Sequence, residues 1–306
     1  MIIAVFPGQG SQTPGFLVPW LEFDGARERL ERYSELAEVD LVAAGTTWDA
    51  DAIRDTRVAQ PLIVAASLLS WHALSASAST RPGGVAGHSV GEIAALVAAG
   101  VLSDDDGMRL VGIRGRAMAD AAARDSTGMS AVLGGDQDAV VARLQELDLT
   151  PANHNGGGQI VAAGALDALA ELAAAPVAGT RVIPLQVAGA FHTRYMAPAI
   201  DALRAAASDV SVTDPALTLW SNRDGRAVTD GRTALDLLVE QVASPVRWDL
   251  CMSSFAEHGV SGIIELSPAG TLTGLAKRAL RGTPAVAVKT PDDIAAAAAL
   301  LTGEDA

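Results

Sequence analysis

Short apolar runs alternate with longer amphipathic stretches along most of this chain. The run IIAVF at 2–6 is rich in β-branched residues and ends at a Pro-Gly turn, which predicts a buried parallel strand. The stretch at 61–74 is apolar on all sides and predicts a buried helix. A second short run at 85–86 leads into an alanine-rich helix that ends before Gly100. This alternation is typical of an α/β protein with a parallel sheet.

The pattern changes between about 126 and 190. Strand and helix patterns follow one another there at short spacing, as a compact β-α-β-α-β run whose last strand extends to about Phe191. The first pattern then resumes and ends in an alanine-rich helix. We therefore predict a large α/β-hydrolase-like domain with a parallel sheet, formed by 1–125 and 191–306, and a small inserted ferredoxin-like α+β subdomain at 126–190.

Composition excludes several classes of protein. A net charge of −14 argues against nucleic acid as a partner, because phosphate binding needs a basic field. Cys251 is the only cysteine, which excludes an internal disulfide and a thiolate metal cluster, and suits a reducing, cytoplasmic compartment. No segment approaches 18 uninterrupted apolar residues, and the N-terminus lacks the positive region of a signal peptide. We expect no membrane span, no metal and no cofactor.

The pentapeptide GHSVG at 87–91 places Ser89 between a short strand and a helix. This is the pattern of a nucleophile elbow, in which glycines permit a strained turn and the helix N-terminus can stabilise an oxyanion. A plain strand-to-helix turn fits the same five residues. A serine hydroxyl also needs a base to become nucleophilic.

Five histidines are candidates for that base. His192 follows a long apolar run where a helix begins, and catalytic groups of α/β proteins gather at such junctions. His154 lies among asparagines and glycines, in a predicted flexible turn that could line a pocket. Position favours His192 over His154. The other three fit structural roles: His88 in a hydrogen bond next to Ser89, His72 in the core and His258 at a helix C-terminus.

Arg114 lies on the apolar side of the helix predicted over 104–123, between Leu110 and Met118. A guanidinium stays charged, so an inward-facing arginine must find an anion. That anion is either an internal Asp or Glu or the carboxylate of a substrate, which a guanidinium binds through two hydrogen bonds. The turn GQGSQ at 8–12 could supply a backbone amide to an oxyanion, but it lacks both phosphate-loop spacings.

Taken together, these segments resemble the malonyl-CoA:acyl carrier protein transacylases and the related acyltransferase domains of polyketide synthases. The resemblance covers nearly the whole chain, and six segments match in the family's order: FPGQGSQ at 6–12, GHSVGE at 87–92, IRGRAM at 113–118, NGGGQIVAAG at 155–164, FHTRYM at 191–196 and EQVASPVRW at 240–248.

The resemblance implies a two-step transfer for fatty acid biosynthesis. Ser89 would take the malonyl group from malonyl-CoA, and the phosphopantetheine thiol of acyl carrier protein would collect it. His192 matches the general base, oriented by a main-chain carbonyl from the segment that holds Gln241 and not by an aspartate. The backbone amides of Gln9 and Val90 match the oxyanion hole.

The same resemblance assigns the substrate contacts. Arg114 matches the arginine that binds the malonyl carboxylate. Asn155 and Phe191 match pocket residues, and Phe191 is of the malonyl type. Arg181 matches a basic residue near the coenzyme or carrier. The family commonly has serine where this chain has Thr193, so a strict preference for malonyl is not implied.

Three other functions fit parts of the sequence. A stand-alone polyketide synthase acyltransferase would use the same residues with malonyl or another extender unit. A serine esterase or patatin-like hydrolase shares GxSxG but gives Arg114 no anion. A catalytically silent carrier-binding domain would not need both Ser89 and His192. We expect a monomer, with a local basic patch for the acidic carrier at Lys277, Arg278 and Arg281.

Overall fold

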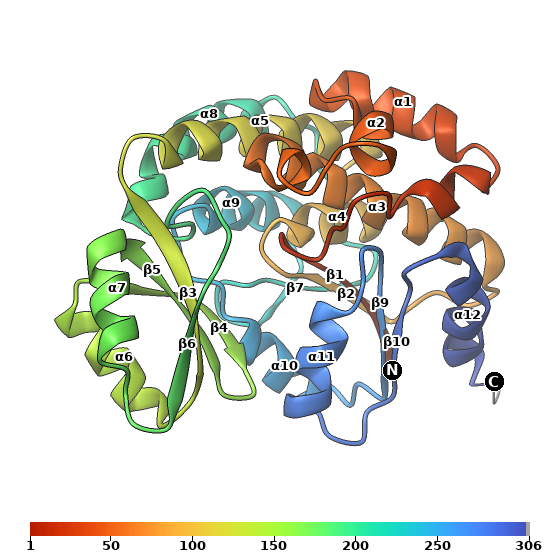
Figure 1. Ribbon diagram of the computed structural model, residues 1–306. Coiled ribbons are helices and arrows are strands. Elements are labelled where there is room, and N and C mark those ends of the chain that lie inside the picture. The colour runs from red at the N-terminus through yellow and green to blue at the C-terminus, as the bar shows by residue number, and fades with distance from the viewer. Residues whose placement is uncertain (304–306) are drawn as a thin grey trace.

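The computed structural model describes residues 1–303 and contains two sheets (Figure 1). The larger sheet has six strands in the order β10-β9-β1-β2-β7-β8, and all neighbours are parallel except β7 and β8. The expected α/β fold with a mostly parallel sheet is confirmed. The strands are β1 (Ile2–Phe6), β2 (Gly84–Gly87), β7 (Thr218–Trp220), β8 (Ala227–Val228), β9 (Gly262–Glu265) and β10 (Ala285–Ala287).

Helices cover both faces of this sheet. Alternation along β1 explains the two layers, because Ala4 and Phe6 face a core that includes α3, α4 and α5, whereas Ile3 and Val5 face α10 and α11. The helices are α1 (Ala26–Ala37), α2 (Leu41–Thr46), α3 (Thr56–Ser77), α4 (Gly91–Ala98), α5 (Asp104–Ala122), α8 (Ala197–Ser208), α9 (Gly231–Gln241), α10 (Trp248–Glu257), α11 (Thr271–Ala279) and α12 (Ile294–Thr302), with 3-10 turns η1 (Val18–Glu22), η2 (Ala52–Arg54), η3 (Arg194–Met196) and η4 (Pro291–Asp293).

The long helix α3 is apolar enough, by length and composition, to cross a membrane. However, 83% of its most apolar window is buried inside the protein. It packs against α4, α5 and α12. The helix is therefore a core helix of the large sheet's layer, as its all-round apolar pattern predicts.

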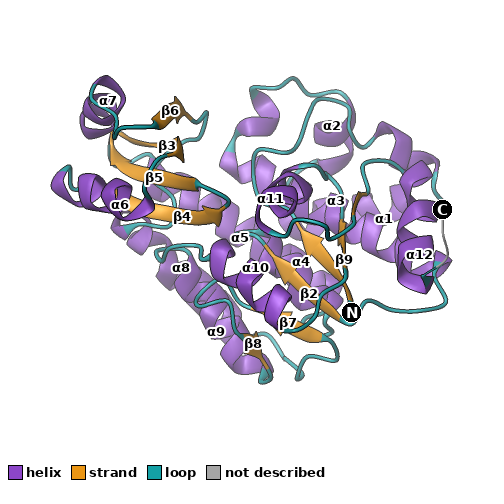
Figure 2. Cartoon of the chain, turned by 90° about the horizontal axis from the view of Figure 1, so that it is seen from below, coloured by secondary structure: helices purple, strands orange, loops and turns teal. Residues whose placement is uncertain are grey.

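The smaller sheet lies beside the larger one (Figure 2) and is antiparallel throughout, in the order β4-β5-β3-β6. Its own core, which includes Val132, Leu144 and Ile160, lies under α6 and α7. The opposite face carries Met129, Ala131 and Val161 and borders the cleft described below. Its elements are β3 (Thr127–Gly134), α6 (Gln137–Glu146), β4 (Thr150–Gly156), β5 (Gln159–Ala165), α7 (Leu166–Ala174) and β6 (Thr180–Pro184).

The predicted β-α-β-α-β run is wrong by one strand, because the segment around His154 is β4 and not a flexible turn. The run is β-α-β-β-α-β. The segment TPANHNG has no apolar alternation, and its register with β5 shifts twice. Hydrogen bonds to Val246 on its other edge support it: the His154 amide donates to the Val246 carbonyl over 2.9 Å, and the Val246 amide donates to Ala152 over 2.9 Å. Tertiary pairing thus outweighs local pattern.

The predicted strand up to Phe191 is also wrong, because β6 ends at Pro184. The chain must cross there from the small sheet to the large one. Gly189 packs against α5, where an added Cβ would lie 2.7 Å from the Cβ of Ala122. The apolar run 185–191 is therefore a connecting loop, of which Leu185, Val187 and Phe191 line the cleft.

Candidate active site

Ser89 lies in a tight turn between β2 and α4. Its φ of 53° is left-handed, a conformation that costs a non-glycine residue about 1 kcal/mol or more. Gly87 and Gly91 cross closely, since a Cβ added to Gly87 would lie 2.0 Å from the carbonyl carbon of Gly91. The two glycines therefore permit a turn that holds Ser89 at the N-terminus of α4.

The turn brings Ser89 to His192, 103 residues further along the chain. Ser89 Oγ lies 2.7 Å from His192 Nε2, and His192 Nδ1 lies 2.9 Å from the main-chain carbonyl oxygen of Gln241. A carbonyl can only accept, so Nδ1 carries the proton and Nε2 is free to accept one from the Ser89 hydroxyl.

Burial keeps the His192 ring uncharged. The side chain is almost fully enclosed, and this burial, together with the positive charge of Arg114, lowers the pKa of His192 to about 3. The imidazole is therefore neutral at neutral pH. A neutral ring with a free Nε2 next to a hydroxyl has the geometry and the charge state of a general base.

Arg114 is buried in α5, as its helix position predicts, with a relative exposure of 1%. Its Nη1 donates to Gln60 Oε1 over 2.7 Å and its Nη2 to Gln241 Oε1 over 3.0 Å. Both partners are neutral amides, and Nε has no partner among the described residues. Burial lowers the pKa of Arg114 to about 10, against the opposing charge of Glu92, so the group stays positive. Glu92 acts on Arg114 only through its charge and makes no hydrogen bond to it, so among the described residues no anion is hydrogen-bonded to the guanidinium.

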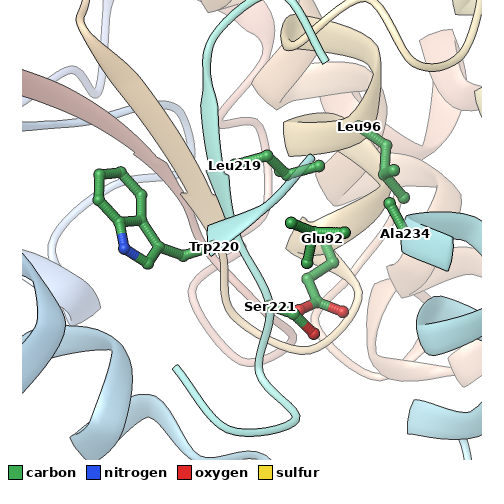
Figure 3. A pocket seen from close by; sticks show the side chains of 7 residues that line it. Glu92, Leu96, Leu219, Trp220, Ser221 and Ala234 are labelled. Carbon is green, nitrogen blue, oxygen red and sulfur yellow. The ribbon is translucent and has the colours of Figure 1, made fainter. Parts of the chain in front are cut away.

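Glu92 lies behind this site, in the first turn of α4, and points toward Ser221 at the end of β7 (Figure 3). Its two carboxylate oxygens accept hydrogen bonds from the Asn222 backbone amide and from Gln241 Nε2. Burial raises the pKa of Glu92 to about 8, while the Asn222 hydrogen bond and the charge of Arg114 oppose the rise. Gln241 therefore joins three groups: its carbonyl holds His192, and its side chain bonds Arg114 and Glu92.

A cleft of about 260 Å³ opens in front of Ser89 and His192. The large sheet, the small sheet and α11 all contribute to it. Of the predicted residues, Gln9, Asn155 and Phe191 line it, and Asn155 Oδ1 lies 2.9 Å from His88 Nε2, the structural hydrogen bond expected of His88. Its other walls include Gln60, Met118, Met129, Val161, Leu185, Val187, Leu272 and Leu275.

Two backbone amides could hold an oxyanion. Gln9 follows β1, and Val90 follows Ser89 at the start of α4. Neither amide donates to another residue within residues 1–303, whereas the Ser89 amide is bonded to Asn222 Oδ1 over 2.8 Å. Two unbonded backbone amides, one of them at a helix N-terminus, are suited to a developing negative charge.

Other candidates lie outside this cluster. Arg181 is exposed on the edge strand β6, and His154 points to the opposite side of β4 from Asn153 and Asn155. His72 was expected in the core, but its side chain is only half-buried. Its Nε2 lies 2.7 Å from Asp104 Oδ2, so the ring has a hydrogen-bond partner. His258 ends α10, as expected. Lys277, Arg278 and Arg281 are exposed at the end of α11, beyond its cleft-lining half.

Thr193 does not face the cleft. Its hydroxyl donates to the Ala190 carbonyl over 2.7 Å and accepts from the Tyr195 amide over 3.2 Å, which caps η3. The side chain is 1% exposed. The threonine therefore retains the capping role that a serine hydroxyl could fill, and it leaves the cleft wall unchanged.

Sequence reasoning missed Gln60 and Asn222 altogether. Gln60 stands directly before the apolar run 61–74, and a polar side chain next to a buried helix is a sequence signal for a buried hydrogen bond. Asn222 follows β7 at the carboxyl edge of the parallel sheet, where α/β sites are built. The contacts of both depend on segments far away in the chain, which no local pattern reports.

Comparison with known proteins gives concordant matches. A family model described as acyl transferase domain matches residues 3–299. The malonyl CoA-acyl carrier protein transacylase of Mycobacterium tuberculosis is 54% identical over 296 residues, 96% of this chain and 98% of that protein. The Escherichia coli protein of that name is 33% identical over 300 residues, which are 96% of this chain and 97% of that protein. The crystal structure of MCAT from Mycobacterium tuberculosis superposes with a TM-score of 0.93 at 53% identity and covers 97% of this chain and 100% of that chain.

The mostly parallel sheet, the antiparallel second sheet and the family match define the chain as an acyl transferase. Within that class, the chain belongs to the malonyl CoA-acyl carrier protein transacylase family.

Proposed function

We propose that this protein transfers a malonyl group from malonyl-CoA to the phosphopantetheine thiol of acyl carrier protein, through a malonyl ester of Ser89. The observation that carries the proposal is Arg114. Its charged guanidinium is buried behind the cleft and is linked to His192 through Gln241, and its hydrogen-bond partners are neutral. An acyl group with a free carboxylate supplies the missing anion, and a plain acetyl group does not.

In the first half-reaction, Ser89 Oγ attacks the thioester carbonyl while His192 Nε2 takes its proton. The carbonyl oxygen becomes negative and is held by the Gln9 and Val90 amides. The C–S bond then breaks, and the proton on His192 passes to the departing coenzyme A thiolate. The products are malonyl-Ser89 and free coenzyme A.

The second half-reaction reverses the roles. The carrier thiol gives its proton to His192, its sulfur attacks the Ser89 ester, and the proton returns to Ser89 Oγ as the C–O bond breaks. Asn155 and Phe191 line the path to the serine. Arg114 keeps hold of the carboxylate in both halves, so the malonyl group stays in place while one thiol replaces the other.

The rival functions differ in what removes the acyl group. An esterase delivers it to water, whereas a transferase delivers it to a thiol. Isotope-labelled malonyl-CoA separates them when malonate and malonylated carrier are both counted. We expect label to accumulate on the carrier. Steady malonate release that the carrier does not reduce would favour the hydrolase, and absence of any turnover would favour a silent carrier-binding domain.

We assign the activity to fatty acid biosynthesis. The mycobacterial and enterobacterial relatives named above support this assignment. A malonyl-transacylase solved with a type II polyketide synthase carrier is 29% identical, with a TM-score of 0.91, and keeps the polyketide role as the second candidate. Transfer measured with a fatty acid carrier and a polyketide carrier in competition decides between them.

Further assignments are part of the same proposal. The β-α-β-β-α-β order supports a ferredoxin-like subdomain at 126–190, inserted into an α/β-hydrolase-like domain at 1–125 and 191–306. A site built from one chain supports a monomer, and the single buried thiol suits the cytoplasm. Arg181 is a candidate contact for the coenzyme or carrier on the β6 edge.

A further inference from the structure

The parallel ladder between β2 and β7 stops just before Ser89. Its last backbone pair is Ala86 with Trp220. Beyond that pair the backbones cannot continue together, because Ser89 turns to a φ of 53° and the chain enters α4. Continued two residues further, this register would place Asn222 opposite His88.

The Asn222 side chain takes the place of the missing backbone. Its Nδ2 donates to the Gly87 carbonyl over 2.7 Å, and its Oδ1 accepts from the Ser89 amide over 2.8 Å. In a parallel ladder, the residue opposite His88 would donate to the carbonyl before His88 and accept from the amide after it. The side-chain amide therefore reproduces the donor and the acceptor that the backbone of a longer β7 would have offered at this position.

The Asn222 backbone is engaged elsewhere, which fixes the side chain. Its amide donates to Glu92 Oε1, and its carbonyl accepts from the Arg247 amide over 2.8 Å. Gln241 Nε2 adds a longer bond to Oδ1, at 3.2 Å. Asn222 is 0% exposed. Glu92 and Gln241 therefore hold Asn222 in place. Gln241 also bonds Arg114 and His192, so Asn222 belongs to the same hydrogen-bond network.

We propose that Asn222 is a positioning residue for the reaction, whose amide clamps the strained Ser89 turn from Gly87 to Ser89 and so sets the Ser89 hydroxyl on His192. The inference rests on the proposed function. An amide carries its donor and its acceptor on two separate atoms, so Asn222 can bond the Gly87 carbonyl and the Ser89 amide at the same time. Its loss should affect the reactivity of Ser89, and not the grip of Arg114 on a carboxylate.

Two substitutions distinguish a role in hydrogen bonding from a role in filling buried volume. Asn222→Leu keeps the volume and removes both bonds. Asn222→Asp keeps the acceptor and regains a donor only when its carboxyl is protonated, which burial beside Glu92 favours. Cys251→Ala is the matched control, because Cys251 is buried against Asn222 with Sγ 3.9 Å from Nδ2 but touches neither Gly87 nor Ser89 in the hydrogen-bond network.

The experiment measures the single-turnover rate of Ser89 acylation by malonyl-CoA, and labelling by a fluorophosphonate, which carries no carboxylate for Arg114. Thermal unfolding reports whether each variant folds. For Asn222→Leu we expect a loss of about 100-fold in both rates, the scale of a misplaced reacting group, with the malonyl-CoA concentration at half-maximal rate unchanged. For Asn222→Asp we expect the rate to recover as pH falls from 7 to 5, a range below the titration of Glu92 over which the parent stays flat. Cys251→Ala should retain the parent rate.

Four results would overturn the proposal: a parent-like rate in Asn222→Leu, a loss confined to malonyl-CoA, an equal loss in Cys251→Ala, or unfolding of both Asn222 variants, which would make the residue structural. A parent protein that forms no malonyl adduct would instead refute the proposed function.

Discussion

At the scale of single residues, burial decides the charge states of the site. It lowers the pKa of His192 to about 3, so the ring is neutral and can accept a proton. It lowers the pKa of Arg114 only to about 10, so the guanidinium remains positive. A neutral base and a fixed cation within one small site match an acyl group that carries a carboxylate.

Replacing Arg114 by alanine should separate malonyl from acetyl transfer. Two charge-assisted hydrogen bonds of about 1.5–3 kcal/mol each are lost to malonyl, so its acylation rate should fall by at least ~100-fold. Acetyl transfer should stay equal or improve, since acetyl makes no such bonds. Steady-state kinetics with both thioesters checks this. Arg109→Ala, an exposed position on the same helix, is the control, and equal losses on both substrates would make Arg114 structural.

The pH profile of acylation tests the state of His192. With its pKa lowered from 6.5 to about 3, the ring stays deprotonated down to about pH 4. The second-order rate of acylation should therefore be flat between pH 7 and pH 5. A base of ordinary pKa near 6.5 would lose roughly 30-fold by pH 5. A fall of that size, centred near 6.5, would contradict the buried neutral histidine.

At the scale of elements, the site depends on how closely β1, β2 and α4 approach one another. Gly91 at the start of α4 packs on β1, where an added Cβ would lie 2.2 Å from the Phe6 carbonyl oxygen. Backbone cannot move aside as a flexible side chain can. The crossing therefore requires glycine, independently of any catalytic role of the turn.

A pair of glycine substitutions measures this requirement. Gly91→Ala should lower the free energy of unfolding by about 3 kcal/mol, the cost of overpacking a tight contact. Gly274→Ala, inside α11 with nothing within 4 Å of the added Cβ, should raise it by about 0.5–1 kcal/mol. Urea unfolding of both variants is the measurement. A Gly91→Ala protein as stable as the parent would show that the contact between β1 and α4 has room for a methyl group.

Sequence pattern predicts these elements unevenly, and the failures have physical causes. Regular apolar periodicity predicts β1, α3, α4 and the buried face of α5 well. The strand β4 escapes prediction because its partners Val161 and Val246 hold a segment that has no strand pattern of its own. The loop after β6 escapes for the opposite reason: it is as apolar as a strand, yet its side chains line a cleft and not a sheet.

At the scale of the whole molecule, the cleft exists because the small sheet lies beside the large one. Local turns, helix phase and resemblance predict Ser89, His192 and Arg114 as site residues. In the structure Ser89 contacts His192, and Gln241 links His192 to Arg114. Gln60, Glu92 and Asn222 complete the network through contacts between segments far apart in the chain. Such contacts follow from the packing of the two sheets and have no local sequence signal.

The carrier should dock at the mouth of this cleft on a local positive surface, although the chain has a net charge of −14. Charge reversal of Lys277, Arg278 and Arg281 should raise the half-saturating carrier concentration about tenfold at low salt, with less effect at high salt. Acylation by malonyl-CoA should be unaffected. Arg204→Glu, exposed on α8, is the control. An equal effect of that control would mean that only net charge matters.

The central claim is that Ser89 carries the malonyl group between two thiols. Intact-protein mass spectrometry after brief exposure to malonyl-CoA tests it most directly, followed by addition of acyl carrier protein. We predict one malonyl adduct per chain, its absence in Ser89→Ala, and its disappearance from the protein as an equal amount appears on the carrier. An adduct that persists in Ser89→Ala, or one that the carrier cannot discharge, would contradict the account.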